Sequence, residues 1–301
     1  MAKLVQCVPN FSEGRRPEVV ERIVEAVGAV AGVRVLDYST DPSHNRAVVT
    51  FIGAAGPVRQ AAFQAAARAA ELIDMEEHRG AHPRIGAADV IPFIPVGDAT
   101  MEECVALARE LGAEIAEKLD LPVYLYESAA ARPERKNLSE VRKGEYEGLK
   151  ETIHLPARRP DFGPARMHPQ AGATAVGARP PLVAYNINLD TADVAIAKAI
   201  AKSIRGSGGG YPSIKALGVM IEDRGAAQVT INVCNYREVS LHRVFETVKS
   251  EASRYGVQIT GSEVVGLLPM EALLDAAAFY LRLEDFKNGQ VLEQRLLDQN
   301  G

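Results

Sequence analysis

The stretch VRVLDYSTDPSHNRAVVTFIG, residues 33–53, decides the fold. Its two arms, 33–39 and 46–53, are rich in β-branched and aromatic residues, which favour strands. Between them, TDPSHN supplies Asp, Pro, Ser and Asn, the residues that form tight turns. The stretch is therefore a predicted β-hairpin. The segments on either side of it, 16–30 and 57–75, are predicted helices, and the first has apolar residues at helical spacing.

Further outward, the runs 3–9 and 89–96 are predicted strands, so the order of elements is β-α-β-β-α-β. A helix at about 100–118 and a strand at 121–127 extend it. This order predicts a ferredoxin-like sheet with helices packed on one face. The run DVIPFIPV, 89–96, contains two prolines, which confine a strand to the edge of a sheet or to a bulge.

The second half repeats the same order after an irregular connection, 128–178, that is rich in Pro, Gly and charge. A connection this long is normally functional or a linker, and only one short helix, 139–150, is predicted in it. The chain is thus expected to be an α/β (α+β) protein with two βαββαβ subdomains, 1–178 and 179–301, and a ligand cleft between them. The elements predicted after the connection are strands at 181–189, 214–223, 227–235 and 257–269, and helices at 191–205, 240–256, 270–283 and 288–298.

Composition excludes several classes of protein. The 301 residues carry a formal net charge of −5, and a mildly acidic surface argues against nucleic acid or an anionic membrane as partner. No apolar run approaches the roughly 20 residues of a membrane span, and the N-terminus lacks the pattern of a signal peptide. Cys7, Cys104 and Cys234 are widely spaced in apolar stretches, which predicts buried free thiols rather than disulfides or a zinc site. A reducing, cytoplasmic location is expected.

The loop HRGAHPRIGAAD, 78–89, carries the main candidate for catalysis. His78 and His82 are four residues apart, but the Gly and Pro within the loop disfavour a helix that would direct both at a metal. Arg79 stands where the zinc-protease motif has Glu, so no metal site is predicted. His78 is expected to be a solvated loop residue. His82 is the candidate acid–base group, because imidazole titrates near neutral pH.

Two other polar stretches offer alternatives. DYSTDPSHNR, 37–46, is either an ordinary hairpin turn or the source of a group that orients His82 or a substrate amine. In VPNFSEGRRPE, 8–18, Ser12 is expected to cap a helix with Asn10 in the turn, although a helix N-terminus could also bind an anion. The loop RGSGGGYPS, 205–213, lacks the order of a phosphate-binding loop, so a flexible connector is expected.

Eight blocks of the sequence form a recognisable set: LVQCVPNFSEGRRPEVV, LDYSTDPSHNR, LIDMEEHRGAHPRIGAADVIPFIPV, LPVYLYESAA, GEYEGL, PDFGP, NINL and GLLPMEALLDAAAFY. These blocks resemble the glutamate formiminotransferase family, which is also a domain of the bifunctional formiminotransferase-cyclodeaminases. The resemblance covers about residues 3–283. It implies two α/β subdomains with a substrate tunnel between them, a homodimer, and His82 as the catalytic histidine. The chain ends soon after the family's domain should, so it looks like a stand-alone enzyme without the cyclodeaminase domain.

The resemblance also implies a folate-binding segment and one departure. Family members often have an acidic residue where Ser39 stands, so either Asp41 is expected to take its place or the proton relay differs. The segment implied to bind folate comprises Gly163, Pro164, Ala165, Arg166, Met167, His168, Pro169, Gln170, Ala171 and Gly172.

The expected reaction is transfer of a formimino group between N-formimino-L-glutamate and tetrahydrofolate, which is a co-substrate, with no metal. Arg46, Arg79 and Arg84 are candidates for binding substrate carboxylates in bidentate fashion, alternatively ordinary surface arginines. Three other functions stay open. They are a formyltransferase that uses N-formylglutamate, a folate-binding protein without catalysis, and a metal-dependent hydrolase.

Overall fold

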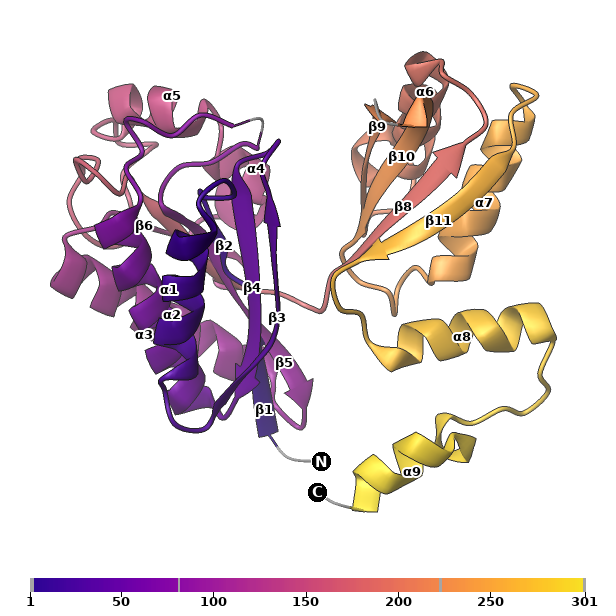
Figure 1. Cartoon of the computed structure of the whole chain (residues 1–301), viewed down its shortest axis with the longest axis horizontal. Coiled ribbons are helices and arrows are strands. Elements are labelled where there is room, and N and C mark those ends of the chain that lie inside the picture. Colours follow the sequence, from indigo (N-terminus) through magenta and orange to yellow (C-terminus); the bar gives the residue numbers. More distant parts are fainter. Residues whose placement is uncertain (1–2, 81, 222–223, 300–301) are drawn as a thin grey trace. The chain divides into compact units, whose positions relative to one another are not determined.

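The computed structural model describes residues 3–80, 82–221 and 224–299, and the chain forms two compact units that divide after Arg179. Each unit has its own sheet, and each is described by itself (Figure 1). In unit 1 the elements that follow the predicted β-α-β-β-α-β order are β1 (Lys3–Cys7), β2 (Asn10–Phe11), α1 (Pro17–Gly28), β3 (Val33–Asp41), β4 (Arg46–Gly53), α2 (Ala55–Leu72) and β5 (Ala88–Gly97).

The strands of unit 1 pair in ferredoxin-like order. β1 and β2 are two parts of one broken strand, and both pair antiparallel with β4 on one side and β5 on the other. β3 pairs with β4 and closes the hairpin that the sequence predicts. The predicted α3 (Met101–Leu119) and β6 (Val123–Glu127) are present as well. The fold expected for this half of the chain is confirmed.

One strand of unit 1 was not predicted. β7 (Thr174–Ala178) lies parallel to both β5 and β6, within the connection that was expected to be irregular. Its sequence TAVGA is short, and all five residues are buried, so it lacks the alternation that marks a half-exposed strand. Gly177 is required there, because a Cβ would lie 2.5 Å from the Tyr126 ring.

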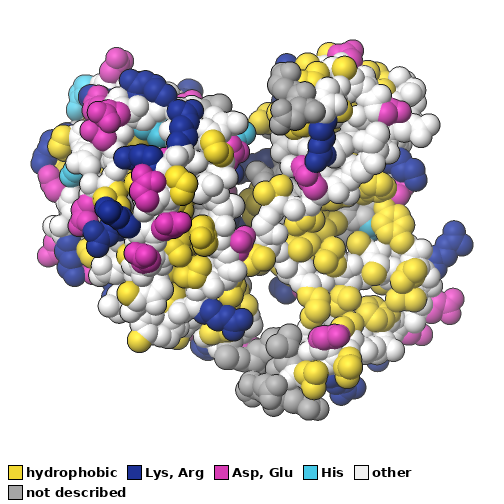
Figure 2. Space-filling model, in the orientation of Figure 1, with side chains coloured by type: hydrophobic (Ala, Val, Ile, Leu, Met, Phe, Trp, Pro, Cys, Tyr) yellow, Lys and Arg dark blue, Asp and Glu magenta, His cyan; other side chains and the backbone are white. Residues whose placement is uncertain are grey.

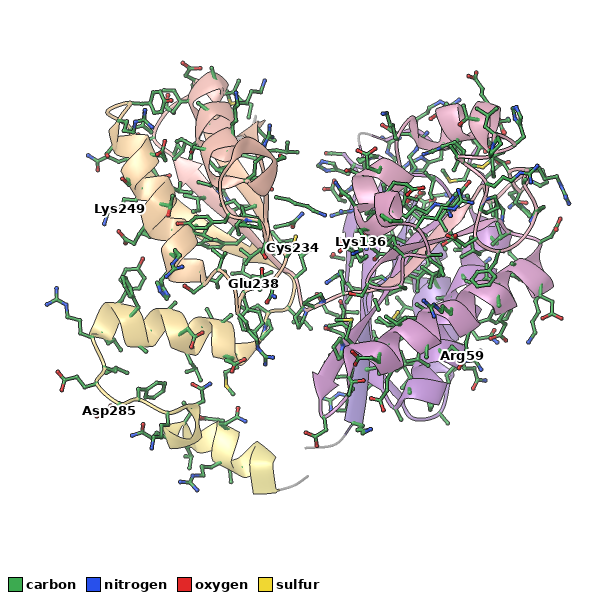
Figure 3. All side chains as sticks on the ribbon, turned by 180° about the vertical axis from the view of Figure 1, so that it is seen from behind. Arg59, Lys136, Cys234, Glu238, Lys249 and Asp285 are labelled. Carbon is green, nitrogen blue, oxygen red and sulfur yellow. The ribbon has the colours of Figure 1, made fainter. Side chains whose placement is uncertain are left out.

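Helices lie on both faces of this sheet rather than on one. α1, α2 and α3 cover one face and enclose the main core. Arg59 of α2, which is labelled in Figure 3, pairs with Glu110 and Glu114 of α3. The other face is covered only over β5, β7 and β6, where a second core cluster packs against α4 (Leu138–Val141) and α5 (Glu145–Thr152). A 3₁₀ turn, Pro133–Lys136, precedes α4.

The expectation that prolines place β5 at an edge is wrong, because β5 pairs with β1 on one side and β7 on the other. Pro92 faces the break between β1 and β2, where Val8 N–H donates to its carbonyl oxygen at 3.4 Å. Pro95 faces the β7 side, but pairing with β7 ends at Phe93. The N–H groups that Pro92 and Pro95 lack would therefore point to places where the hydrogen bonding between neighbouring strands is interrupted. The pairing of β2 with β5 does contain a register irregularity.

Unit 2 is a second ferredoxin-like fold, as predicted. Its antiparallel sheet has the order β11-β8-β10-β9, and α6 and α7 pack over one face. Asp193 caps α6 by accepting a hydrogen bond from Ala195 N–H at 2.8 Å, so the helix begins three residues after the predicted start at residue 191. The elements are β8 (Val183–Leu189), α6 (Val194–Ile204), β9 (Ile214–Ile221), β10 (Ala226–Val233), α7 (Leu241–Ser253) and β11 (Ile259–Val265).

Two predicted helices follow, α8 (Met270–Leu281) and α9 (Leu292–Gln299), with a 3₁₀ turn at Asn288–Gln290 before α9. α8 packs on α7 through the stacked rings of His242 and Phe279. Hydrophobic side chains nevertheless gather on the surface over α8 (Figure 2). The glycine loop after α6 contains a 3₁₀ turn, Gly206–Gly208, and packs closely: a Cβ at Gly208 would lie 1.9 Å from the Lys202 carbonyl oxygen. No helix in the described part of the chain has the length and apolar character to cross a bilayer.

Candidate active site

The tip of the β3–β4 hairpin, residues 41–46, packs on the loop that carries His82. Asn45 joins the two segments from a left-handed backbone conformation (φ 48°) and is 7% exposed. Its side-chain N–H donates to the Arg79 carbonyl at 3.0 Å, and its own carbonyl bonds His78 Nε2 at 2.9 Å. Its side-chain oxygen accepts from Gly14 N–H at 2.9 Å. Asn45 therefore links three segments that are distant in sequence.

Glycines allow these segments to approach closely. A Cβ at Gly80 would lie 2.4 Å from the His44 carbonyl oxygen, and one at Gly14 would lie 2.4 Å from the Asp41 carbonyl oxygen. Both distances are far below van der Waals contact, so only glycine fits without a backbone shift. The hairpin tip and the His82 loop thus form one packed structure.

His78 is not a solvated residue, contrary to expectation, since it is only 6% exposed. Its Nε2 bonds Asn45, and its Nδ1 accepts from Arg84 Nε at 3.2 Å. Burial lowers the pKa of His78, which favours the neutral ring that these two bonds need. His78 is a buried link between the hairpin tip and Arg84.

Arg84 is 5% exposed, and its guanidinium is already engaged by protein carboxylates. It forms a bidentate pair with Glu147 of α5, at 2.8 and 2.7 Å, and a further bond of 3.1 Å to Glu145. The hydrogen bond from Arg84 holds the pKa of Glu147 at about 2. All three guanidinium nitrogens are used, so Arg84 fixes the loop to α5, and binding of a substrate carboxylate by Arg84 is disfavoured.

Asp89, at the start of β5, fixes the other end of the loop. It is 2% exposed, and its Oδ1 accepts from Ile85 N–H at 2.8 Å. Its Oδ2 pairs with Arg142, which follows α4. The carboxylate thereby brings Arg142 to the same region as His82.

His82 is half-buried among cations. Burial, with the charges of Arg46 and Arg142 nearby, lowers its pKa from 6.5 to about 3. Burial also lowers the pKa of Arg46. The Nε atoms of Arg46 and Arg142 are both buried, and neither has a hydrogen-bond partner among the described residues. A neutral imidazole beside two incompletely paired guanidinium groups is suited to an anionic ligand.

Asp41 bonds His44 rather than His82. Its Oδ2 lies 2.6 Å from His44 Nδ1, and its Oδ1 accepts from the backbone N–H groups of Ser43 and His44 at 2.9 and 3.0 Å. Partial burial raises the pKa of Asp41, but these bonds and the His44 charge outweigh it, so the pKa is lowered. Asp41 is also the cross-strand neighbour of Arg46. Ser39 stands two residues earlier on β3, opposite Val48.

The segment 163–172 runs beside the far end of the His82 loop. Its second half is held there by backbone bonds from Met75 N–H to the Gln170 carbonyl (2.8 Å) and from Ala87 N–H to the Ala171 carbonyl (2.9 Å). His168 Nδ1 accepts from the N–H groups of Gln170 and Ala171 and so shapes the turn. Ala171 and Gly172 are buried. Gly163, Ala165, Arg166 and Pro169 are exposed, whereas Pro164, Met167, His168 and Gln170 are half-buried.

The β2 region departs from expectation in two respects. Asn10 lies on a strand and not in a turn, and Ser12 does not cap α1: its Oγ donates to the Gly86 carbonyl at 2.8 Å. No side chain that the structure describes caps α1, and Glu13 Oε1 accepts from the N–H groups of Arg15 and Arg16 just before the helix. Asn10 is half-buried on β2, paired with Val48 of β4. It therefore shares a face of the sheet with Arg46, which lies two residues before Val48 on β4.

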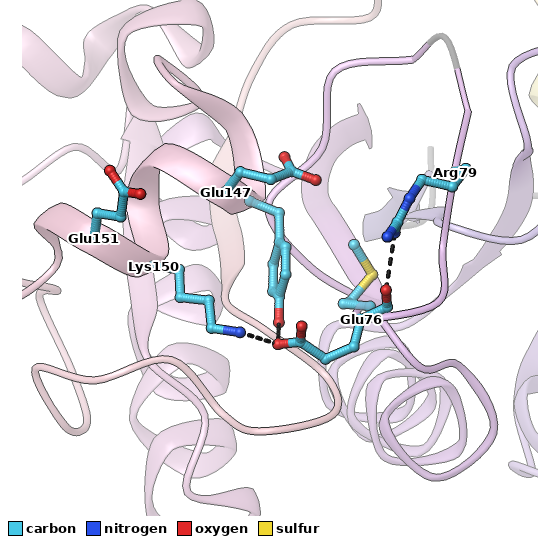
Figure 4. Close-up of a pocket in the computed structure, with 7 residues that line it drawn as sticks. Glu76, Arg79, Glu147, Lys150 and Glu151 are labelled. Carbon is cyan, nitrogen blue, oxygen red and sulfur yellow. Dashed lines mark hydrogen bonds and ion pairs between the residues drawn. The ribbon is translucent and has the colours of Figure 1, made fainter.

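A pocket of about 350 Å³ lies between α5 and the start of the loop (Figure 4). Inside it, Glu76 accepts hydrogen bonds from Tyr146 Oη at 2.6 Å and from Lys150. Arg79 is exposed and donates to the carbonyls of Glu76 and His78. These charged groups already pair with protein atoms, so Arg79 supports the loop from this pocket. The remaining lining residues are Met75, Glu147 and Glu151.

Among the described residues, no group of three or more His, Cys, Asp or Glu side chains is arranged to hold a metal. Within the described part of the chain, Cys7, Cys104 and Cys234 form no disulfide. Burial raises the pKa of Cys7 well above its ordinary value and that of Cys104 to about 12, so both are inert. Cys234 is half-buried, not buried as expected.

The sequence did not point to Arg142, Asp89 or the role of His44. Arg142 lies in a charged stretch, and only the fold directs it to Asp89 across 53 residues. His44 was visible in the turn, and its spacing of three from Asp41 is the usual spacing of a local side-chain hydrogen bond in a turn.

Two family models together match most of the chain. The model of the formiminotransferase domain, N-terminal subdomain, matches residues 4–179, and the model of the formiminotransferase domain matches 184–296. A glutamate formimidoyltransferase of Streptococcus pyogenes serotype M1 is 52% identical over 99% of this chain and 100% of its own length. One from Thermoplasma acidophilum is 48% identical over 97% of each chain. A formimidoyltransferase-cyclodeaminase of Dictyostelium discoideum is 43% identical over 98% of this chain, but over 56% of its own length. The chain belongs to the formiminotransferase family.

Proposed function

We propose that this protein is a glutamate formimidoyltransferase, which transfers a formimino group between N-formimino-L-glutamate and tetrahydrofolate. The observation that carries the proposal is the identity of 52% with a protein of that name along the whole of both chains. The neutral His82 beside Arg46 and Arg142 agrees with it, because the reaction needs a proton acceptor and a site for anions.

The chemistry requires two proton transfers. N5 of tetrahydrofolate attacks the amidine carbon, and the tetrahedral intermediate expels the glutamate nitrogen. N5 loses a proton, and the leaving nitrogen gains one. In the proposed mechanism His82 accepts the proton from N5, a role for which a neutral ring is suited. Such acid–base catalysis contributes roughly 100- to 10,000-fold.

Arg46 and Arg142 are proposed to bind a substrate carboxylate through their unpaired Nε atoms. The bound carboxylate would also offset the two positive charges that disfavour a protonated His82. Substrate binding would therefore raise the pKa of His82 towards neutrality. Proton acceptance is thus favoured only when the donor is in place.

Residues 163–172 are proposed to bind folate, together with Asn10. Support comes from the exposure of Gly163, Ala165 and Arg166, which lie in the first half of this segment and can be reached by a ligand. Folinic acid should protect the segment from amide hydrogen exchange. A peptide covering α6 in unit 2 serves as the reference, and equal exchange of residues 163–172 with and without folinic acid would remove them from the site.

The donor is tested by assays with N-formimino-L-glutamate and N-formyl-L-glutamate, each with tetrahydrofolate. A formimidoyltransferase uses the first at least 10-fold better in kcat/KM. Preference for the second would make it a formyltransferase. Turnover of neither donor, with folinic acid still bound, would indicate a folate-binding protein.

His82→Ala should lower kcat by about 100-fold or more, because it removes the proton acceptor. Binding of folinic acid, measured by calorimetry, should stay within a few-fold of wild type. The matched control is His154→Ala, an exposed histidine after α5 that should retain full activity. A folded His82→Ala protein with wild-type turnover would overturn the assignment.

The proposal extends to a cytoplasmic homodimer. α8 exposes Leu273, Phe279 and Leu281, and association would bury such side chains. Light scattering at micromolar concentration measures the oligomeric state, and a mass of 32.4 kDa would exclude the dimer.

A further inference from the structure

We propose that His44, held by Asp41, is a second catalytic residue, which exchanges the proton at the glutamate nitrogen while His82 serves N5 of the folate. This inference rests on the proposed function. It gives Asp41 a role other than the expected one of orienting His82.

The Asp41–His44 pair is built so that one ring nitrogen is fixed and the other is available. Three hydrogen bonds join Asp41 to His44 and its neighbour: one to the ring at Nδ1 (2.6 Å) and two to backbone N–H groups. Nδ1–H therefore points at the carboxylate, and Nε2 is left to exchange a proton with a substrate. The same logic orients the histidine of hydrolase triads. The His44 side chain is 51% exposed, so a ligand can reach it.

The pair is held against the His82 loop by the backbone. The His44 carbonyl touches Gly80, two residues before His82, and the adjacent Asn45 bonds both His78 and Arg79. Arg46, the next residue, begins β4 opposite Asp41. The charges of His44 and Asp41 both act on His82, in opposite directions. A ligand that contacts Arg46 and His82 is therefore within reach of His44.

The surroundings of the two histidines suit opposite roles. Burial and the charges of Arg46 and Arg142 keep the resting His82 ring neutral, so it has no proton to give to the leaving nitrogen. His44 has a carboxylate as its neighbour, which balances the charge of an imidazolium. Pairs of titratable groups in unlike surroundings can divide acid and base functions between them.

The proposed step is balanced as follows. A bond forms between N5 and the amidine carbon, and N5 transfers its proton to His82. The bond between that carbon and the glutamate nitrogen then breaks, and its electron pair leaves with nitrogen. The nitrogen takes a proton from the His44 imidazolium. The free enzyme returns to its starting state when His82 releases a proton to water and His44 takes one up.

The test uses the full-length protein and chemical rescue by imidazole. His44→Ala should lower kcat by about 100-fold. Added imidazole should restore at least a tenth of the wild-type rate, because it can occupy the vacated space. Asp41→Asn should lower kcat without rescue, since His44 is still present. His154→Ala is the matched control, unaffected in both kcat and response to imidazole. Binding of folinic acid within twofold of wild type verifies that each variant is folded.

Three results would overturn the inference. One is a kcat for His44→Ala within threefold of wild type. Another is a fall in kcat for His44→Ala that imidazole does not reverse, while His44→Asn retains the wild-type kcat. That result would make the side chain a structural part of the turn. In both cases the wild-type enzyme transfers the formimino group and the proposed function stands. Absence of transfer by the wild-type protein from either donor would instead reject the proposed function, and the role of His44 with it.

Discussion

The sequence identified His82 as a catalytic candidate but did not distinguish the roles of the arginines around it. Its place in a Gly- and Pro-rich loop, with arginines on both sides, was enough to select it as an acid–base candidate. The sequence offered Arg46 and Arg84 equally as residues that bind a substrate carboxylate, and the structure distinguishes between them. Arg84 is saturated by Glu147 and Glu145, whereas Arg46 retains a buried, unpaired Nε. Pairing of this kind depends on contacts across more than 60 residues, which spacing along the chain does not encode.

The first prediction for a single residue concerns the pKa of His82. Because burial and two arginines disfavour its protonated form, NMR should find the His82 ring neutral from pH 5 to pH 8 in the unliganded protein. Arg46→Met should raise its pKa by removing one cation, and Arg34→Met, on the exposed face of β3, should not. A bound dicarboxylate such as glutamate should raise it also. A wild-type pKa near 6.5 would contradict the argument.

The lowered pKa of His82 also affects the stability of the folded protein in acid. Between pH 6.5 and pH 3 the unfolded chain binds a proton at His82 that the folded protein does not bind. This residue therefore contributes a loss of stability as pH falls through that range. His82→Gln, which has no such titration, should show a smaller fall in the free energy of unfolding between pH 6.5 and pH 4.5, measured by urea denaturation. An equal fall in both proteins would show that His82 titrates normally.

Arg84 holds the His82 loop against α5. Arg84→Lys should lower the free energy of unfolding by about 2 kcal/mol or more, because an ammonium group cannot make the bidentate bond and leaves carboxylates and His78 unpaired. Urea denaturation measures the change. The control is Arg68→Lys, whose pair with Glu71 is exposed and should contribute less than about 1 kcal/mol. Equal effects of the two substitutions would mean that Arg84 is not a structural anchor.

Gly86 determines how closely the His82 loop approaches residues 171–173. A Cβ there would lie 1.9 Å from the Ala173 carbonyl oxygen, so Gly86→Ala must separate two paired backbones. We expect a loss of stability of about 3 kcal/mol or more, as for other strained backbone sites. Gly28→Ala, at the end of α1 with open space around it, should be neutral or stabilise by up to about 1 kcal/mol. Thermal unfolding of both variants tests this, and a stable Gly86→Ala protein would contradict it.

Elements were predictable where local pattern decides them. The 33–53 hairpin has strong strand formers and a turn with Pro, Ser and Asn, and both ferredoxin-like units follow from such patterns. β7 was missed because five small, fully buried residues have no alternation to detect. β5 was misplaced for the opposite reason: its prolines are locally unfavourable, yet the interruptions of β1 and β7 accept them. Strand position within a sheet depends on partners that are far away in sequence.

At the level of the whole molecule, the residues proposed for catalysis and binding belong to one of the two units. His82, His44, Arg46, Arg142 and residues 163–172 all lie in unit 1. The core clusters of unit 1 share no residue with that of unit 2, and each unit has its own sheet. A unit with a complete core and no strand borrowed from elsewhere is expected to fold alone. The site geometry described above should therefore persist without residues from 180 onward.

The last prediction follows from this separation. A fragment of residues 1–179 should unfold cooperatively, and NMR should find its His82 ring neutral at pH 6, as in the full chain, because Arg46, Arg142 and Asp89 are all present in it. His82→Ala in the same fragment identifies the resonance. Loss of chemical-shift dispersion in the fragment would show that unit 2 is needed to form the core. A dispersed spectrum with a normally titrating His82 would show instead that residues of unit 2 create the unusual surroundings of this histidine.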